Sequence, residues 1–218
     1  MSKEKTLKSI RELGLLAVIR GPSPELTLKM VEALVDGGVS GIEITYSTPD
    51  AANVVRSIIK RLGDQVLVGM GTLTDPSQAT EAKAAGARFI VSPHCEALLA
   101  EAMCATGLAV MIGAFTASEV FHAHQLGSDV VKLFPGSLGG PAYLKALRAP
   151  FPHIPMMPTG GVDAHNLGEW FDAGAYAVAA GSQLCPVDLV KAGQFEEIRA
   201  RAQSFVKAVE QARKPTPA

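Results

Sequence analysis

Eight short apolar runs, each followed by a helix-forming segment, recur along the chain at intervals of roughly 21–26 residues. This spacing is typical of βα units joined by short loops. The eight predicted strands are residues 15–20, 41–45, 66–70, 88–91, 108–112, 130–134, 154–158 and 175–180. Because strands that alternate with helices form parallel sheets, we expect an α/β fold with parallel strands.

A closed barrel accounts for this repeat better than an open sheet does. Eight units in 218 residues fit a small (β/α)8 TIM barrel with few insertions. An open doubly wound sheet is the alternative, but it usually carries a glycine-rich dinucleotide turn after its first strand, and residues 20–24 (RGPSP) are not such a turn. We therefore predict a single TIM-barrel domain over residues 1–218, with about 214–218 as a frayed tail.

Helix start signals support this reading of the segments between the strands. Ser23 before Pro24 and Asp75 before Pro76 are typical of helix N-termini. Other helices are expected from about residue 50, around residues 116–119, over 163–173 and from about 195 to 213.

The composition is that of an ordinary globular protein. Hydrophobic residues make up 48% of the chain, and its net charge of -1 gives no general attraction to nucleic acid or membrane surfaces. No apolar run approaches the roughly 20 residues that span a bilayer, and no signal peptide is visible, so we expect a cytoplasmic protein. The three cysteines lack C-x-x-C spacing, which argues against a disulfide framework or a cysteine-based zinc site.

A lysine interrupts the sixth predicted strand. Lys132 shares a strand face with Val130 and Phe134. If both faces of the strand are buried, its amine lies in an apolar wall, which costs on the order of several kcal/mol unless the charge is paired or the amine is neutral. A neutral buried amine is a candidate nucleophile. The alternative is a surface lysine on an edge strand, or one whose stem extends past its neighbours to water.

A glutamate interrupts the second predicted strand in the same way. Glu43 alternates with Gly41 and Thr45, so it is expected to point into the barrel. Facing Lys132, it would form either a structural ion pair or a catalytic pair in which burial favours the neutral form of both groups. We prefer the catalytic interpretation, a nucleophilic amine beside a proton shuttle, because of the phosphate signals that follow.

Polar residues gather where the predicted strands end, which is where barrels of this type carry their sites. They are Arg20, Glu43, Thr45, Thr72, Ser92, Lys132, Thr159 and Ser182. Gly160 and Gly161 follow the seventh strand, and Gly181 precedes Ser182 after the eighth. Glycines let backbone N–H groups approach an anion, and the loops after strands seven and eight of many barrels hold a phosphate. Phosphate binding is therefore preferred over the alternative that these glycines only make tight turns.

The histidines do not indicate a metal site. His122 and His124 are two residues apart on a predicted helix, so they point to different faces. His94, His153 and His165 are isolated in the sequence. We expect no metal.

Taken together and in this order, six motifs make the chain resemble the KDPG/KHG aldolase family, the class I 2-keto-3-deoxy-6-phosphogluconate and 4-hydroxy-2-oxoglutarate aldolases. The resemblance runs nearly end to end. The motifs are residues 41–45 (GIEIT), 69–72 (GMGT), 91–93 (VSP), 131–135 (VKLFP), 158–161 (PTGG) and 181–182 (GS).

The resemblance implies a Schiff-base aldolase that cleaves 2-keto-3-deoxy-6-phosphogluconate, or a related 2-keto-4-hydroxy acid, to pyruvate and an aldehyde such as glyceraldehyde 3-phosphate. This chemistry belongs to carbohydrate metabolism of the Entner–Doudoroff type. Lys132 would form the Schiff base and Glu43 would shuttle protons. Since the iminium accepts the electrons, neither a metal nor an organic cofactor is expected.

The resemblance also implies a binding set and an assembly. Thr72, Pro93 and Phe134 match the family's lining around the keto acid, whereas Gly160, Gly161 and Ser182 match its phosphate-binding positions. From charge and geometry we add Arg20 as a bidentate partner for the substrate carboxylate or phosphate. The family usually forms trimers, so a homotrimer is expected.

One position departs from the family pattern. Several members place a substrate-contacting arginine two residues after the Glu-x-Thr segment, where this chain has Ser47. The departure leaves open the C4 epimer and the choice between phosphorylated and short substrates. Two other functions stay open: a phosphate-binding barrel isomerase or epimerase, which needs no inward lysine, and a non-catalytic sugar-phosphate binder.

Overall fold

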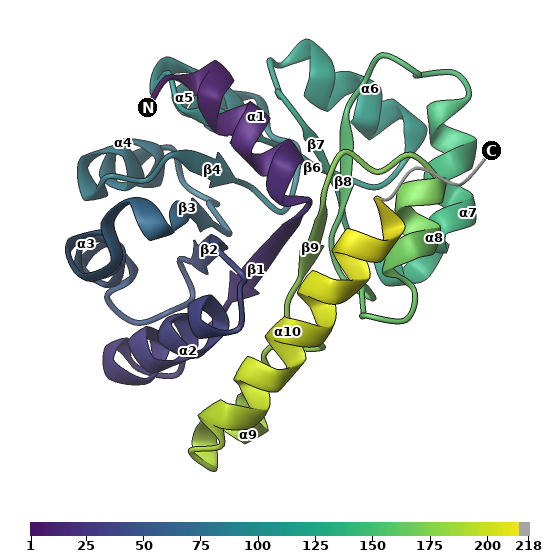
Figure 1. Cartoon of the computed structure of the whole chain (residues 1–218). Coiled ribbons are helices and arrows are strands. Elements are labelled where there is room, and N and C mark those ends of the chain that lie inside the picture. The colour runs from purple at the N-terminus through teal and green to yellow at the C-terminus, as the bar shows by residue number, and fades with distance from the viewer. Residues whose placement is uncertain (214–218) are drawn as a thin grey trace.

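The chain folds into a ring of parallel strands surrounded by helices, as the computed structural model in Figure 1 shows. The structure describes residues 1–213, so the predicted tail at 214–218 lies outside the described residues. The strands are β1 (Leu15–Ile19), β2 (Gly41–Thr45), β3 (Leu67–Gly71), β4 (Phe89–Val91), β5 (Ala109–Met111), β6 (Gly113–Ala114), β7 (Val131–Leu133), β8 (Met156–Pro158) and β9 (Val178–Ala180).

The strands pair into two parallel sheets that together close the barrel. One sheet has the order β5-β4-β3-β2-β1-β9 and the other the order β6-β7-β8. Ile112 alone separates β5 from β6, so these two segments form one strand of the barrel. A parallel bridge between Thr159 and Ala179 joins the end of β8 to β9. The predicted α/β barrel with parallel strands is confirmed.

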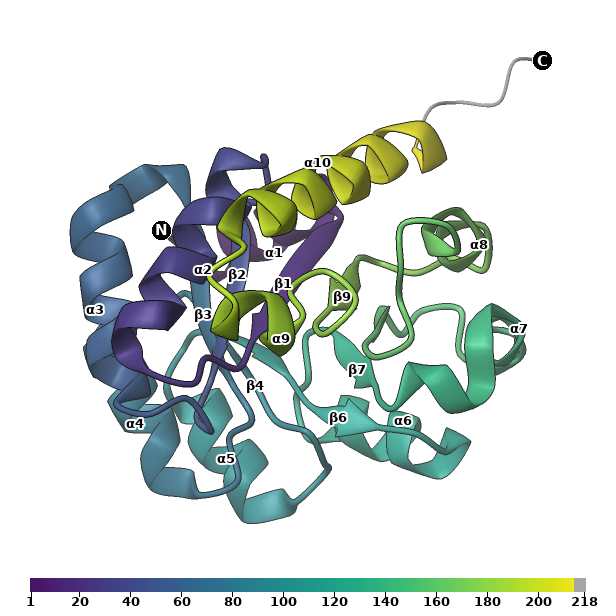
Figure 2. The ribbon, with the colours of Figure 1, turned by 90° about the horizontal axis from the view of Figure 1, so that it is seen from below.

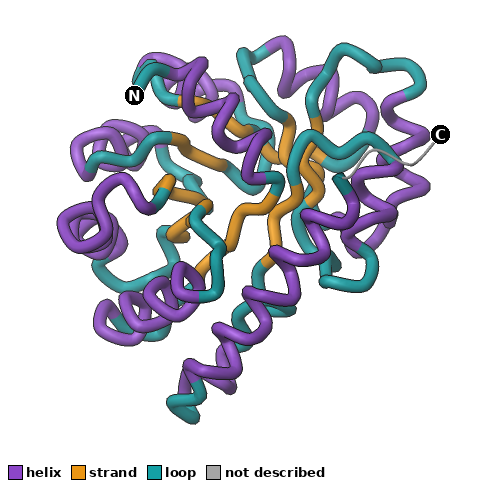
Figure 3. The backbone as a smooth tube through the Cα atoms, in the orientation of Figure 1, coloured by secondary structure: helices purple, strands orange, loops and turns teal. Residues whose placement is uncertain are grey.

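The helices form the outer layer, with the strands gathered in the centre in Figure 3. They are α1 (Lys3–Leu13), α2 (Pro24–Asp36), α3 (Ala51–Leu62), α4 (Pro76–Ala85), α5 (Ala97–Ala105), α6 (Ala117–Gln125), α7 (Gly136–Arg148), α8 (Leu167–Asp172), α9 (Val187–Lys191) and α10 (Phe195–Ala212). The last of these, α10, packs against α2 and α8 and buries one face, including Ile198, Phe205 and Val209.

Two separate hydrophobic clusters show which face of each strand points inward. The larger cluster lies between the strands and the helices and includes Ile44, Val131 and Leu133. The smaller one includes Leu16, Phe89, Val130 and Met157. Each of these alternates along its own strand with members of the larger cluster, so the smaller cluster fills the inside of the barrel. Val130, Lys132 and Phe134 therefore share the inner face, as predicted.

The helix α1, which was not expected from the sequence, covers the N-terminal end of the barrel. Its Ile10 is fully buried and belongs to the inner cluster. The Tyr176 hydroxyl, just before β9, donates a hydrogen bond to the Leu7 carbonyl at 2.8 Å, and the Lys3 ammonium lies 2.9 Å from Asp129, just before β7. In Figure 2, turned by 90° from Figure 1, α1 and β1 are seen from below.

Other sequence expectations differ from the structure in detail. The helix predicted over residues 163–173 begins at Leu167, because the Asp163 carboxylate accepts hydrogen bonds from the His165 and Asn166 N–H groups and forms a turn first. His153, isolated in the sequence, has a histidine neighbour in the fold, since its ring lies edge-on to that of His124 with 5.5 Å between the centroids. 

Candidate active site

Lys132 and Glu43 face each other inside the barrel, from β7 and β2. The Lys132 Nζ atom lies 3.8 Å from Glu43 Oε1, and their side chains are 5% and 0% exposed. Lys132 is thus neither on an edge strand nor on the surface. The predicted pairing of the two inward groups is what the structure shows.

The pair is electrostatically unusual because the carboxylate lacks hydrogen bonds. Neither Glu43 oxygen has a hydrogen-bond partner among the described residues, and 3.8 Å is too long for one from Lys132. Burial raises the pKa of Glu43 above its ordinary value, and the attraction of the Lys132 ammonium offsets part of that rise. A carboxyl with a raised pKa therefore lies beside a buried amine, an arrangement typical of sites that use acid–base chemistry.

Three of the predicted lining residues lie at the ends of β3, β4 and β7. Thr72 follows β3 with a φ of 60°, a left-handed conformation that costs a non-glycine residue about 1–2 kcal/mol and is concentrated at functional sites. The Lys132 Nζ atom lies 5.3 Å from the centre of the Phe134 ring, which is 39% exposed at the end of β7.

Pro93, the third of these residues, crosses close to β6. A Cβ atom on Gly113 would collide with the Pro93 backbone, so only a glycine at 113 lets this loop approach β6 so closely. Just before Pro93, the buried Ser92 hydroxyl donates a hydrogen bond to the His94 carbonyl at 2.8 Å, which fixes the loop.

The predicted anion-binding residues follow β8, β9 and β1, which are neighbours around the barrel. Gly160 and Gly161 have φ values of 89° and 74°, which only glycine adopts without strain. Ser182 is exposed after β9, and Arg20 is exposed after β1, the strand beside β9. The loop at Gly160 also lies against the first turn of α7, where the Gly136 N–H donates to the Thr159 carbonyl at 2.8 Å. The residues that carry these N–H groups, the hydroxyl and the guanidinium thus follow neighbouring strands, on one sector of the rim.

Ser47, the residue that departs from the family pattern, already has a hydrogen-bond partner. Its hydroxyl lies 2.8 Å from that of Thr45, which donates to the Ile19 carbonyl at 3.1 Å. The hydrogen bond between these two hydroxyls engages the Ser47 side chain within the protein. The cation placed near Ser47 is Arg20, which follows β1, the strand that pairs with β2.

Thr159 completes the site and was left out of the predicted binding set. Its side chain is buried at the end of β8, and its hydroxyl has no hydrogen-bond partner among the described residues. A buried hydroxyl is usually paired, so this one is available to a ligand. The sequence already placed it among the polar residues at the strand ends, and its inward position, the signal that singled out Lys132, could have added it to the binding set.

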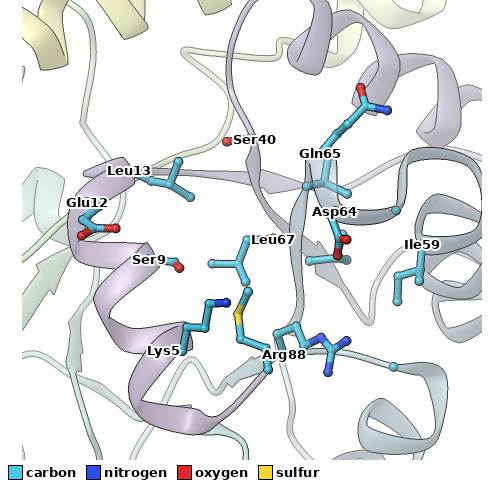
Figure 4. A pocket seen from close by; sticks show the side chains of 15 residues that line it. Lys5, Ser9, Glu12, Leu13, Ser40, Ile59, Asp64, Gln65, Leu67 and Arg88 are labelled. Atoms are coloured by element: carbon cyan, nitrogen blue, oxygen red, sulfur yellow. The ribbon is translucent and has the colours of Figure 1, made fainter.

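Features away from the C-terminal rim do not indicate a particular ligand. A cavity of about 770 Å³ lies at the opposite end of the barrel, between α1 and the start of β3, and Figure 4 shows charges of both signs around it, including Lys5, Asp64 and Arg88. Within residues 1–213, no three His, Cys, Asp or Glu side chains are grouped so as to hold a metal ion. Over the same residues, no helix combines the length and apolar character that crossing a bilayer requires.

Comparison with known proteins gives one consistent result. Residues 7–201 match the family model described as KDPG and KHG aldolase. The chain is 36% identical to 2-dehydro-3-deoxy-6-phosphogalactonate aldolase of Escherichia coli (strain K12), over 92% of this chain and 97% of that protein. It is 34% identical to 2-dehydro-3-deoxy-phosphogluconate aldolase of Treponema pallidum (strain Nichols), over 85% and 92% of the two chains.

A solved structure agrees with these sequence matches. The KDPG aldolase of Legionella pneumophila, solved with pyruvate captured as a covalent carbinolamine, superposes with a TM-score of 0.84 at 28% identity, over 94% of this chain and 98% of that one.

Proposed function

The chain belongs to the KDPG and KHG aldolase family of carbon–carbon lyases, and we propose that it cleaves a 6-phosphorylated 2-keto-3-deoxy sugar acid through a Schiff base on Lys132. The observation that carries the proposal is the buried pair of Lys132 and Glu43, with 3.8 Å between amine and carboxylate. The products are pyruvate and an aldehyde, glyceraldehyde 3-phosphate for a six-carbon substrate.

In the proposed reaction, Lys132 supplies the nucleophile. Its neutral amine adds to the C2 ketone to give a carbinolamine, and loss of water gives the iminium. Cleavage of the C3–C4 bond sends its electron pair into the iminium, which becomes the enamine of pyruvate. Protonation at C3 and hydrolysis then release pyruvate and restore the amine.

Glu43 is proposed as the group that moves the protons. Protonated, it assists the departure of water from the carbinolamine; ionised, it accepts the C4 hydroxyl proton as the C3–C4 bond breaks. The same carboxyl returns a proton to C3 of the enamine. A raised pKa suits this exchange, because burial makes the protonated form easier to reach than it is for an exposed carboxyl.

The two anionic ends of the substrate are assigned to different parts of the rim. The phosphate is proposed to bind the N–H groups of Gly160 and Gly161 and the Ser182 hydroxyl, with Arg20 as a bidentate cation nearby. The keto-acid end lies among Thr72, Pro93 and Phe134, close to Lys132. The free Thr159 hydroxyl is available to a substrate hydroxyl.

The choice between C4 epimers is the finer part of the proposal. The two relatives named above act, by their names, on the phosphogalactonate and the phosphogluconate compound. Comparing kcat/KM for both epimers, and for the short substrate 4-hydroxy-2-oxoglutarate, would assign the substrate. We expect both phosphorylated acids to be preferred over the short one, because the latter leaves the anion-binding loops empty.

Reductive trapping tests the mechanism. The protein is incubated with pyruvate, reduced with borohydride and digested, and the adduct is located by peptide mass spectrometry. We expect one adduct, on Lys132, that is absent without pyruvate and absent from Lys132→Met. Lys145→Met, on the outer helix α7, is the control and should trap pyruvate normally.

An adduct on another lysine, or no adduct on folded protein, would contradict the mechanism. In that case the phosphate-binding isomerase or epimerase would become the better proposal, since it uses the same glycine loops without an imine. Binding of a sugar phosphate without any turnover would instead favour the non-catalytic binder.

A further inference from the structure

Gly71, at the end of β3, is the residue that makes room for the Glu43 carboxyl. A Cβ atom on Gly71 would overlap Oε1 and Cδ of Glu43 and lie 2.6 Å from its Cγ. All three of the nearest atoms belong to Glu43. The glutamate therefore occupies the space that any larger residue at position 71 would fill.

The strand register shows why the carboxyl lies there. Glu43 pairs with Gly69 across β2 and β3, whereas Gly71 pairs with Thr45, one inward position nearer the C-terminal end of the barrel. The Glu43 side chain thus leans toward the substrate end. The space over Gly69 is not available to it, because the Phe89 ring from β4 fills that space.

Hydrogen bonds do not account for the position of the carboxyl. Both Glu43 oxygens lack partners among the described residues, and the nearest cation, Lys132, is 3.8 Å away. Most catalytic carboxyls are oriented by hydrogen bonds from neighbouring groups. Here the recess over Gly71 and the attraction of Lys132 take that role.

We propose that Gly71 is a positioning residue, whose lack of a side chain holds the Glu43 carboxyl in line with the carbon bonded to Lys132. The inference rests on the proposed function, because it assigns the carboxyl a proton-transfer step. Small displacements of a reacting group, of about 1 Å, can cost about 100-fold in rate.

The test uses a proton-transfer reaction that needs no aldehyde. Once pyruvate forms the imine, a carboxylate at the position of Glu43 removes a methyl proton to give the enamine, and return of a deuteron from deuterated water labels the methyl group. Methyl exchange followed by NMR measures this step, whereas borohydride trapping measures the imine alone. 

The variant is Gly71→Ala, prepared both in the wild-type chain and in Glu43→Ala. In the wild-type background we expect methyl exchange to fall by about tenfold or more, with trapping on Lys132 retained. In the Glu43→Ala background, Gly71→Ala should change the residual exchange by less than about twofold, since the collision and the proton acceptor are both gone. The control is Gly168→Ala on α8, because the Cβ atom added there would have its nearest neighbour 4.0 Å away, an ordinary van der Waals contact.

If Gly71→Ala impairs folding, the midpoints of thermal unfolding of the variants provide the test. A loss of folding in Gly71→Ala that Glu43→Ala restores supports the inference, because it reports the same collision. Equal losses of exchange or stability in both backgrounds, or an unchanged exchange in Gly71→Ala, would overturn it. Absence of trapping in the wild-type chain would contradict the proposed function instead, and the thermal comparison would still test the recess.

Discussion

The Glu43–Lys132 pair is unfavourable for folding and useful for catalysis. Both groups are withdrawn from water, the carboxylate has no hydrogen bond among the described residues, and a separation of 3.8 Å recovers only part of the lost hydration. Buried charges of this kind are usually better paired. At the scale of the residue, the chain retains a costly arrangement where its proposed chemistry needs one.

The pH dependence of stability should reveal this cost. Burial raises the pKa of Glu43 in the folded chain above the value of about 4.5 that the carboxyl has in the unfolded chain. As pH rises, the unfolded chain therefore loses this proton before the folded chain does. The stability contributed by the protonated carboxyl is complete below the unfolded pKa and is lost as pH rises through the folded pKa. Lys132→Met removes the attraction that offsets the rise, so the loss should grow.

Urea unfolding at pH 5 and pH 8 measures the effect. We expect Lys132→Met to lose about 1–3 kcal/mol more between these pH values than the double variant Glu43→Gln/Lys132→Met, which has no carboxyl at this position. Identical pH dependence of the two variants would show that Glu43 ionises in the fold without penalty.

The sequence predicted the paired residues but not how they are held. Strand alternation alone places Lys132 and Glu43 inside a barrel, and the structure confirms that placement. The role inferred for Gly71 could not be predicted from the sequence. It depends on the Glu43 carboxyl occupying the space where a Cβ atom at position 71 would lie, and only the structure shows which atoms are there. The hydrogen bond that occupies Ser47 likewise depends on a backbone carbonyl of another strand.

At the scale of the element, capping residues were the reliable signals. Ser23, Asp75 and Thr116 each accept a hydrogen bond from the first turn of the helix that follows, as expected of Ser, Asp and Thr in these positions. Boundaries failed where side chains formed local turns instead, as at Asp163. The first helix was missed because its sequence is charged and its few apolar residues contact the barrel interior, a partner that is defined only by the fold.

Helix α1 should matter to stability more than its charged sequence indicates. Ile10 is fully buried in the inner cluster, so Ile10→Ala leaves a cavity and should lower the free energy of unfolding by about 2–5 kcal/mol. Lys8→Ala, two residues earlier on the exposed face, should change it by less than about 0.5 kcal/mol. Urea unfolding at one pH compares the two. A small effect of Ile10→Ala would mean that α1 rests on the barrel without closing it.

At the scale of the whole molecule, the eightfold repeat was enough to predict the barrel. Every strand that the repeat requires is present, once β5 and β6 are taken as one strand interrupted at Ile112. β8 and β9 are joined by the bridge from Thr159 to Ala179 and by a hydrogen bond from the Tyr176 N–H to the Met156 carbonyl, contacts that no local sequence pattern predicts. The homotrimer stays a prediction, and sedimentation equilibrium would test it against the 22.8-kDa mass of one chain.

The position of α1 also has a kinetic consequence. Because this helix covers the N-terminal end, in the proposed reaction both fragments of a cleaved substrate would leave Lys132 by way of the C-terminal rim, and the fragment bonded to the lysine would leave second. Release would then be ordered, with the aldehyde first and pyruvate last. Product-inhibition kinetics should show pyruvate competing with the substrate for the free enzyme and the aldehyde acting as a mixed inhibitor. The reverse pattern would mean that pyruvate leaves before the aldehyde, which would contradict an enamine held on Lys132.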